Sequence, residues 1–119
     1  LPAIALATDI AAITCIANDY GYDELFARQV RAHERKGDVA IAISTSGNSP
    51  NVLKGVEAAR ACGLTTICWT GGTGGKLAGL VEYPFVVLST VTARIQESHI
   101  TLGHVLCELI EEQLLAKAS

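Results

Sequence analysis

The sequence predicts an α/β domain, a three-layer, doubly wound fold in which helices cover both faces of a parallel sheet. Short apolar runs of strand length alternate with amphipathic stretches of helical period along the 119 residues. Glycine and Ser-Pro signals stand at the boundaries between them. Half of the residues are hydrophobic and 18% are charged, which favours strands buried on both faces or a large subunit interface.

The first third of the chain contains two expected strands and one expected helix. Residues 3–6 are a short apolar run typical of a strand. Residues 18–21, Asn-Asp-Tyr-Gly, have turn composition, and we expect a loop there. Residues 23–33 fit a helix with acidic residues in its first turn, ended by Gly37. Residues 39–43 are a continuous apolar run, which predicts a strand buried on both faces.

A second helix is expected to begin at Pro50. Ser49 is a good N-cap residue and proline suits the first helical position, while Gly63 marks the end of the helix. Residues 64–70 are an expected strand, followed by a flexible glycine-rich turn at 71–75 and a short helix at 76–80. Another strand is expected at 84–88 and the longest helix at 92–116.

Composition and charge exclude several classes of protein. The net charge of −3 argues against a nucleic-acid partner, and no apolar run approaches the roughly 18 residues that would cross a membrane. No secretory signal is evident, and the four cysteines form no C-x-x-C pair, so we expect them to be reduced and mostly buried, in a cytoplasmic protein. The chain contains no Met, so we expect Leu1 not to be an ordinary translation start.

The strongest motif is the segment Ser44–Pro50, where an expected buried strand ends and an expected helix begins. Ligands of open α/β sheets bind at the carboxyl ends of strands, and a helix N-terminus favours anions. The hydroxyls of Ser44, Thr45, Ser46 and Ser49 add neutral donors around such an anion. The alternative is that Ser49 only caps the helix. A cap accounts for one hydroxyl and not four, so the motif predicts phosphate binding.

Two other motifs are weaker. Residues 70–76, Thr-Gly-Gly-Thr-Gly-Gly-Lys, lack the spacing of a P-loop, which favours a flexible turn that helps close a site. Gln96, His99 and His104 lie on the longest expected helix, with Gln96 and His104 eight residues apart. That spacing allows both side chains to reach a ligand between them, but alone it favours core or surface histidines over metal ligands.

Taken together, these residues resemble the sugar isomerase (SIS) domains. Asp38–Asn51, DVAIAISTSGNSPN, is similar to their strand and phosphate loop, and Arg94–Glu97 followed by His99 and His104 resembles the last helix of the phosphoheptose isomerases. Leu1–Leu6 and the Asn18-Asp19 pair also have counterparts there. The resemblance implies a flavodoxin-like, five-stranded parallel sheet, and it identifies residues 1–119 as one SIS domain that lacks the first strand and the N-terminal helices.

The same resemblance implies an activity, the conversion of sedoheptulose 7-phosphate to D-glycero-D-manno-heptose 7-phosphate for lipopolysaccharide-type sugars, in a homotetramer. Ser44, Thr45, Ser46 and Ser49 would hold the phosphate, and Asn18 and Asp19 would contact the sugar. Gln96 and His104 would be two zinc ligands, with Gln96 also touching substrate and His104 placed for proton transfer. The family's other zinc ligands, a His and the Glu base, lie upstream of the matched segment. We therefore expect these 119 residues alone to be inactive.

Two non-enzymatic alternatives remain open. A related SIS family binds the bacterial replication initiator protein, and it carries a non-ligand residue at the position of His104. Other SIS domains sense a sugar phosphate and regulate a partner without catalysis. Ser46, Ser49 and His104 favour the isomerase over the initiator-binding family, and turnover measured alongside binding separates catalysis from sensing.

Overall fold

The computed structural model describes residues 1–118 and has a three-stranded parallel sheet at its centre. The strands β1 (Val39–Ile43), β2 (Thr65–Gly71) and β3 (Tyr83–Val87) pair in the order β1-β2-β3. Residue 41 pairs with 67 and residue 69 with 85, so all three strands end at the same edge. The predicted α/β class and parallel sheet are confirmed, and the expected strands at 39–43, 64–70 and 84–88 match within one residue.

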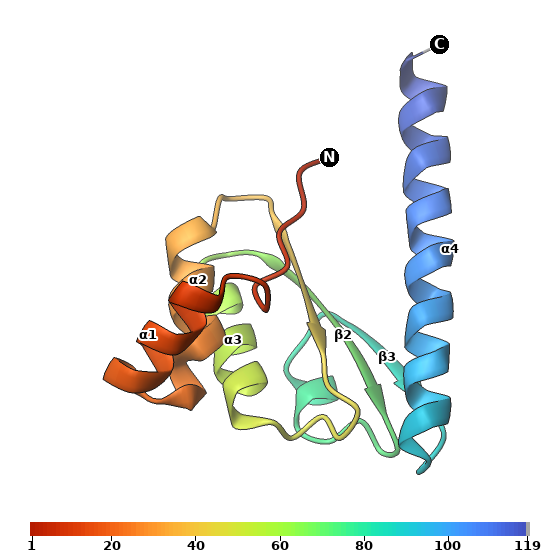
Figure 1. The fold of residues 1–119 in the computed structure, drawn as a ribbon. Coiled ribbons are helices and arrows are strands. Elements are labelled where there is room, and N and C mark those ends of the chain that lie inside the picture. The colour runs from red at the N-terminus through yellow and green to blue at the C-terminus, as the bar shows by residue number, and fades with distance from the viewer. Residues whose placement is uncertain (119) are drawn as a thin grey trace.

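Helices cover the two faces of this sheet unequally (Figure 1). On one side α3 (Pro50–Ala61) packs on β1 and β2, and α2 (Leu25–His33) packs on α3. On the other side the single helix α4 (Thr92–Ala118) contacts β2 and continues well past the sheet (Figure 1). The remaining elements are α1 (Ile10–Tyr20) and the 3-10 turns η1 (Tyr22–Glu24) and η2 (Leu77–Gly79).

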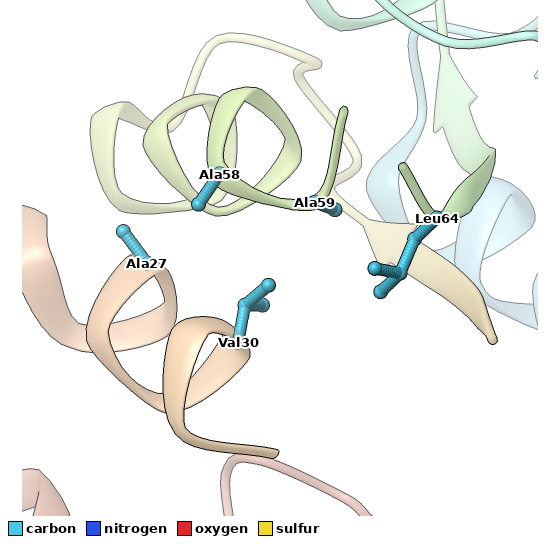
Figure 2. Close-up of a cluster of buried hydrophobic side chains, with 5 residues drawn as sticks. All are labelled: Ala27, Val30, Ala58, Ala59 and Leu64. Carbon is cyan, nitrogen blue, oxygen red and sulfur yellow. The ribbon is translucent and has the colours of Figure 1, made fainter. Parts of the chain in front are cut away.

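Small side chains let α2 and α3 approach closely. Figure 2 shows Ala27 on α2 facing Ala58 on α3, with Val30, Ala59 and Leu64 completing a buried cluster. A second cluster, Val56, Cys68 and Leu77, lies between α3 and the sheet. Burial of such side chains contributes about 25 cal/mol per Å² of apolar surface, and it makes the α2–α3 side of the sheet the main core.

Three residues on one stripe of α4 attach it to β2. Ile95 packs against Gly71, where a side chain would collide with it. The ring of His99 lies 6.3 Å from that of Trp69, and the same Trp69 ring lies beside Gly103. The wide apolar face predicted for this helix is only partly covered, because Val105, Leu109, Ile110 and Leu114 are exposed.

The N-terminal segment differs from the prediction. Residues 3–6 form no strand, because β1 pairs only with β2 and no ladder reaches them; Leu6 instead offers its carbonyl to Gln29 Nε2 at 3.0 Å. The helix α1 was not predicted. Asp9 caps it by accepting a hydrogen bond from the Ala12 N–H at 3.0 Å, so Asn18 and Asp19 lie in its last turns and not in a loop.

Two burial predictions were also wrong. Val39, Ile41 and Ile43 of β1 are about half exposed, at 55%, 48% and 53%, because β1 is an edge strand and α4 covers β2 instead. Of the cysteines only Cys68 is buried; Cys62 is half-buried, and Cys15 and Cys107 are exposed, all as free thiols. Within residues 1–118, no helix combines the length and apolar character that crossing a membrane requires.

Candidate functional site

The segment Ser44–Ser49, here called the first loop, folds back tightly where β1 ends. The Ser44 N–H donates to the Trp69 carbonyl at 3.0 Å, and the Gly47 N–H donates to the Ser44 carbonyl at 3.1 Å. Ser44 Oγ and Ser49 Oγ share a hydrogen bond at 3.1 Å. Ser49 occupies the N-cap position of α3 but caps no N–H of the helix, so simple capping does not explain its hydroxyl.

Backbone and side-chain bonds also hold the middle of the first loop. The Thr45 carbonyl accepts from the Gly71 N–H at 3.1 Å, which fastens it to the end of β2. Ser46 Oγ accepts from the Asn48 N–H at 3.2 Å, and Asn48 Nδ2 donates back to the Ser46 carbonyl at 3.0 Å. The loop therefore presents its hydroxyls from a fixed backbone at the positive end of the α3 dipole.

The glycine-rich segment 72–76, here called the second loop, is bonded directly to the first. The Leu77 N–H donates to the Gly47 carbonyl at 3.0 Å, and the Lys76 N–H donates to Asn48 Oδ1 at 3.1 Å. These bonds hold the glycine-rich turn against the first loop, in agreement with the prediction that it helps to close a site.

Glycines make this contact possible. A Cβ on Gly75 would lie 2.6 Å from the carbonyl oxygens of both Ser46 and Gly47, and a Cβ on Gly47 would collide with the Gly74 carbonyl. Gly47, Gly74 and Gly75 all have positive φ, at 64°, 87° and 57°. Only glycine meets both conditions without strain.

Three βα loops surround a pocket of about 290 Å³ at the carboxyl edge of the sheet. Thr45 and Ser46 come from the first loop, and Thr73 comes from the second. The segment 88–91, here called the third loop, and the start of α4 contribute Ser89, Thr90 and Thr92. No charged side chain among the described residues lines the pocket, so its polar groups are neutral hydroxyls and backbone amides. Such a pocket can bind an oxygen-rich ligand, but it holds no side chain that titrates near neutral pH.

The predicted sugar-contacting pair lies elsewhere. Asn18 Nδ2 donates to Asp19 Oδ1 at 2.7 Å, and Asp19 Oδ2 accepts from Cys15 Sγ at 3.5 Å. This hydrogen bond, with the charge of Asp19, raises the pKa of the Cys15 thiol. Both side chains are exposed at the end of α1 and do not line the pocket.

The predicted metal ligands lie on α4, outside the same pocket. Gln96 lines a separate open groove of about 500 Å³ along the helix, and His104 is exposed. His99 is buried, and its Nε2 lies 3.2 Å from the Thr70 carbonyl, which makes it a structural histidine.

The described residues do not fit a zinc ion by themselves. No group of three His, Cys, Asp or Glu side chains within residues 1–118 could hold a metal, and Gln96 with His104 supplies at most two donors. A catalytic zinc site takes three protein ligands and a water, so these residues do not complete one.

Sequence reasoning missed the third-loop hydroxyls and the role of Asn48. The Ser-Thr pair at 89–90 follows an expected strand directly, and parallel strands end at a common edge, so topology offered a signal for it. The bond from Lys76 to Asn48 joins residues 28 apart and had no local signal.

Comparisons with known proteins support the resemblance found in the sequence. The SIS domain family matches residues 1–71. The phosphoheptose isomerase of Aquifex aeolicus is 55% identical over 99% of this chain and 62% of its own length. The phosphoheptose isomerase of Thermodesulfovibrio yellowstonii is 57% identical over 96% of this chain and 57% of its own length.

Solved structures agree with the sequence matches. The phosphoheptose isomerase of Neisseria gonorrhoeae superimposes with a TM-score of 0.90 at 49% identity, covering 92% of this chain and 62% of that one. The phosphoheptose isomerase of Francisella tularensis has a TM-score of 0.91 at 41% identity, and the match covers 94% of this chain and 60% of that one. The chain therefore spans about 60% of the length of the relatives it matches.

Proposed function

The chain belongs to the SIS domain family, and from this membership we propose that it carries the sugar-phosphate-binding loops of a phosphoheptose isomerase. The observation that carries the proposal is the first loop. Its Ser44–Ser49 hydroxyls stand on a fixed backbone at the N-terminus of α3, beside a pocket that no charged side chain of the described residues lines. Neutral donors and a helix dipole together suit a phosphate group.

The proposed reaction is the conversion of sedoheptulose 7-phosphate to D-glycero-D-manno-heptose 7-phosphate. In this aldose–ketose isomerisation one group removes a proton from the carbon beside the carbonyl, and protons move between the two oxygens of the enediol. Ser44, Thr45, Ser46 and Ser49 would hold the phosphate. Asn18 and Asp19, exposed at the end of α1, would contact the sugar from outside the pocket.

His104 is the proposed proton-transferring group. It is exposed, which leaves its imidazole accessible to a substrate, and histidine is the side chain that most often transfers protons in enzymes. Zinc remains part of the proposal, with Gln96 and His104 as two of its ligands. These two donors do not complete a zinc site, which takes three protein ligands and a water.

We further propose that the protein works as a cytoplasmic homotetramer. The exposed apolar side chains of α4 and the exposed face of β1 support association with further copies. Size-exclusion chromatography with light scattering tests this, and a monomer at micromolar concentration would contradict it.

A sugar-phosphate sensor is the second candidate function. It is favoured by one observation, that no titratable side chain among the described residues lines the pocket, so binding there needs no catalytic group. A binder of the replication initiator uses the same fold, but nothing in the described surface favours that partner.

One titration separates these functions. Calorimetry with sedoheptulose 7-phosphate is run on the purified protein, and heptose phosphate formation is followed in the same samples with and without zinc. We expect the parent protein to bind the sugar phosphate and Ser44→Ala and Ser49→Ala to bind it more weakly. Ser98→Ala should bind it unchanged, because the Ser98 hydroxyl donates only to the Arg94 carbonyl within α4. Turnover by the protein produced from its native gene supports the isomerase, and binding without turnover by that same protein supports the sensor. Absence of binding contradicts both.

A further inference from the structure

We propose that Thr90 and Thr92 bind hydroxyl groups of the sugar part of the ligand whose phosphate lies against the first loop. This inference rests on the proposed function and adds to it the part of the site that recognises the carbohydrate. Thr90 belongs to the third loop and Thr92 is the first residue of α4, and neither is part of the Ser/Thr motif that the sequence singles out.

The two threonines face the same pocket as the first loop. Thr45 and Ser46 line one side of this 290 Å³ space, and Thr90 and Thr92 line it from the third loop and α4. Its volume is at the low end of the range that holds small-molecule ligands, about 300–1,000 Å³. A ligand held at the first loop and extending into the pocket therefore meets the third loop.

Other bonds fix the shape of the third loop and leave these two hydroxyls available. Ser89 Oγ accepts from the Val91 N–H at 3.1 Å, and the Ser89 carbonyl accepts from the Gly72 N–H at 3.0 Å. Thr90 and Thr92 make no side-chain hydrogen bond within the described part of the chain, and both are exposed. A binding group held on a rigid backbone loses little entropy when it engages a ligand.

The chemistry of the pocket favours a sugar over a second anion. A threonine hydroxyl both donates and accepts, as a carbohydrate hydroxyl does, whereas a phosphate at neutral pH mainly accepts. No lysine or arginine lines the pocket among the described residues. The first-turn N–H groups of α4 at Thr92, Ala93 and Arg94 have no acceptor within residues 1–118 and can donate to sugar oxygens.

The experiment compares two probes, sedoheptulose 7-phosphate and inorganic phosphate, by calorimetry on the protein as produced from its native gene. The variants are Thr90→Val, Thr92→Val and the double variant, which keep side-chain shape and remove hydroxyls. Thr92→Ser restores a hydroxyl. Thr14→Val, an exposed threonine of α1 whose hydroxyl bonds the Ile10 carbonyl, is the matched control.

We expect each valine to weaken sugar phosphate binding by about fivefold and the double variant by about 25-fold, the effect of one ordinary hydrogen bond per hydroxyl. Inorganic phosphate should bind all variants within about twofold of the parent protein, and Thr92→Ser and Thr14→Val should bind both probes normally. Circular dichroism and thermal unfolding confirm that the variants fold.

Two outcomes overturn the inference while the proposed function stands. If both probes weaken equally, the third loop binds the phosphate and not the sugar. If neither probe changes while the parent protein binds both, the ligand does not reach the third loop. If the parent protein binds neither probe, the proposed function itself fails, and this inference fails with it.

Discussion

His99 Nε2 lies 3.2 Å from the backbone carbonyl oxygen of Thr70, and this contact joins α4 to β2. A carbonyl oxygen only accepts, so Nε2 must carry the proton. The imidazole is 4% exposed and is tilted over the Trp69 ring. The contact therefore fixes the position of α4 at the end of the strand from which the second loop begins.

Removing this imidazole should destabilise the fold. In His99→Leu the Thr70 carbonyl loses its side-chain donor, and we expect a loss of about 1–3 kcal/mol in the free energy of unfolding, measured in urea. His33→Leu, at an exposed position at the end of α2, should change stability by less than about 0.5 kcal/mol. Equal losses in both variants would show that the His99 contact contributes nothing specific.

Two threonines of β2 should respond in opposite ways to the same substitution. Both are 0% exposed. Thr66 Oγ1 accepts from the Glu82 N–H at 3.2 Å, whereas Thr70 Oγ1 has no hydrogen-bond partner in residues 1–118. We expect Thr66→Val to cost about 1–3 kcal/mol in the free energy of unfolding and Thr70→Val to be neutral or stabilising. A comparable loss at Thr70 would mean that its hydroxyl has a partner in solution.

A side chain at Gly75 should separate the first and second loops. Its Cβ would lie 2.6 Å from two backbone carbonyl oxygens, at a residue with positive φ. We expect Gly75→Ala to lower the free energy of unfolding by about 2 kcal/mol and to weaken phosphate binding by about tenfold. Gly79→Ala is the control, since nothing lies within 4 Å of its Cβ position. Unchanged phosphate affinity in Gly75→Ala would contradict the role of the second loop in holding the first.

The ion pair between η1 and α3 should make stability depend on pH. Lys54 Nζ lies 2.8 Å from Glu24 Oε1, and this hydrogen bond lowers the pKa of Glu24 below its ordinary value of 4.5. A carboxyl with a lowered pKa in the folded state stabilises that state at pH values above its ordinary range, and the contribution is lost as pH falls through the lowered pKa.

The parent protein should therefore be more stable than Glu24→Gln at neutral pH, and this difference should shrink in acid and in high salt. Urea titrations from neutral pH down to about pH 2 measure it. Glu111→Gln, on α4 and without an ion pair among the described residues, should show no such trend. A stability difference between the parent protein and Glu24→Gln that persists in acid would rule out the charge of Glu24 as its source.

Much of the fold was predictable because its signals are local. Ser49 and Pro50 mark the start of α3, and Gly63, with φ of 75°, follows its end as predicted. The α1 helix was missed because Asn18 and Asp19 resemble a turn, although Asp9 stood ahead of the segment as a capping residue. The exposed face of β1 was not predictable in the same way, because strand order and the position of α4 decide it.

In the candidate site, too, the features with a local sequence signal were predictable and the tertiary contacts were not. The hydroxyls of the first loop could be identified because a strand–loop–helix motif carries them within six residues. The bonds from Leu77 to Gly47 and from Lys76 to Asn48 are tertiary contacts between separate loops, and no local pattern encodes them. The positions of Asn18, Asp19, Gln96 and His104 as ligand contacts stay predictions.

The length of α4 divides that helix into two parts of different local stability. Its 27 residues extend about 40 Å, roughly twice the length of the strands that it crosses. The first part contacts β2 through Ile95 and His99, whereas the second part continues past the sheet (Figure 1) and exposes Leu109, Ile110 and Leu114. Isolated helices shorter than about 12–15 residues are marginal in water, so the amide protons of the second part should exchange quickly with solvent in a single copy of the chain. Slow exchange there would report that another surface covers this part of the helix.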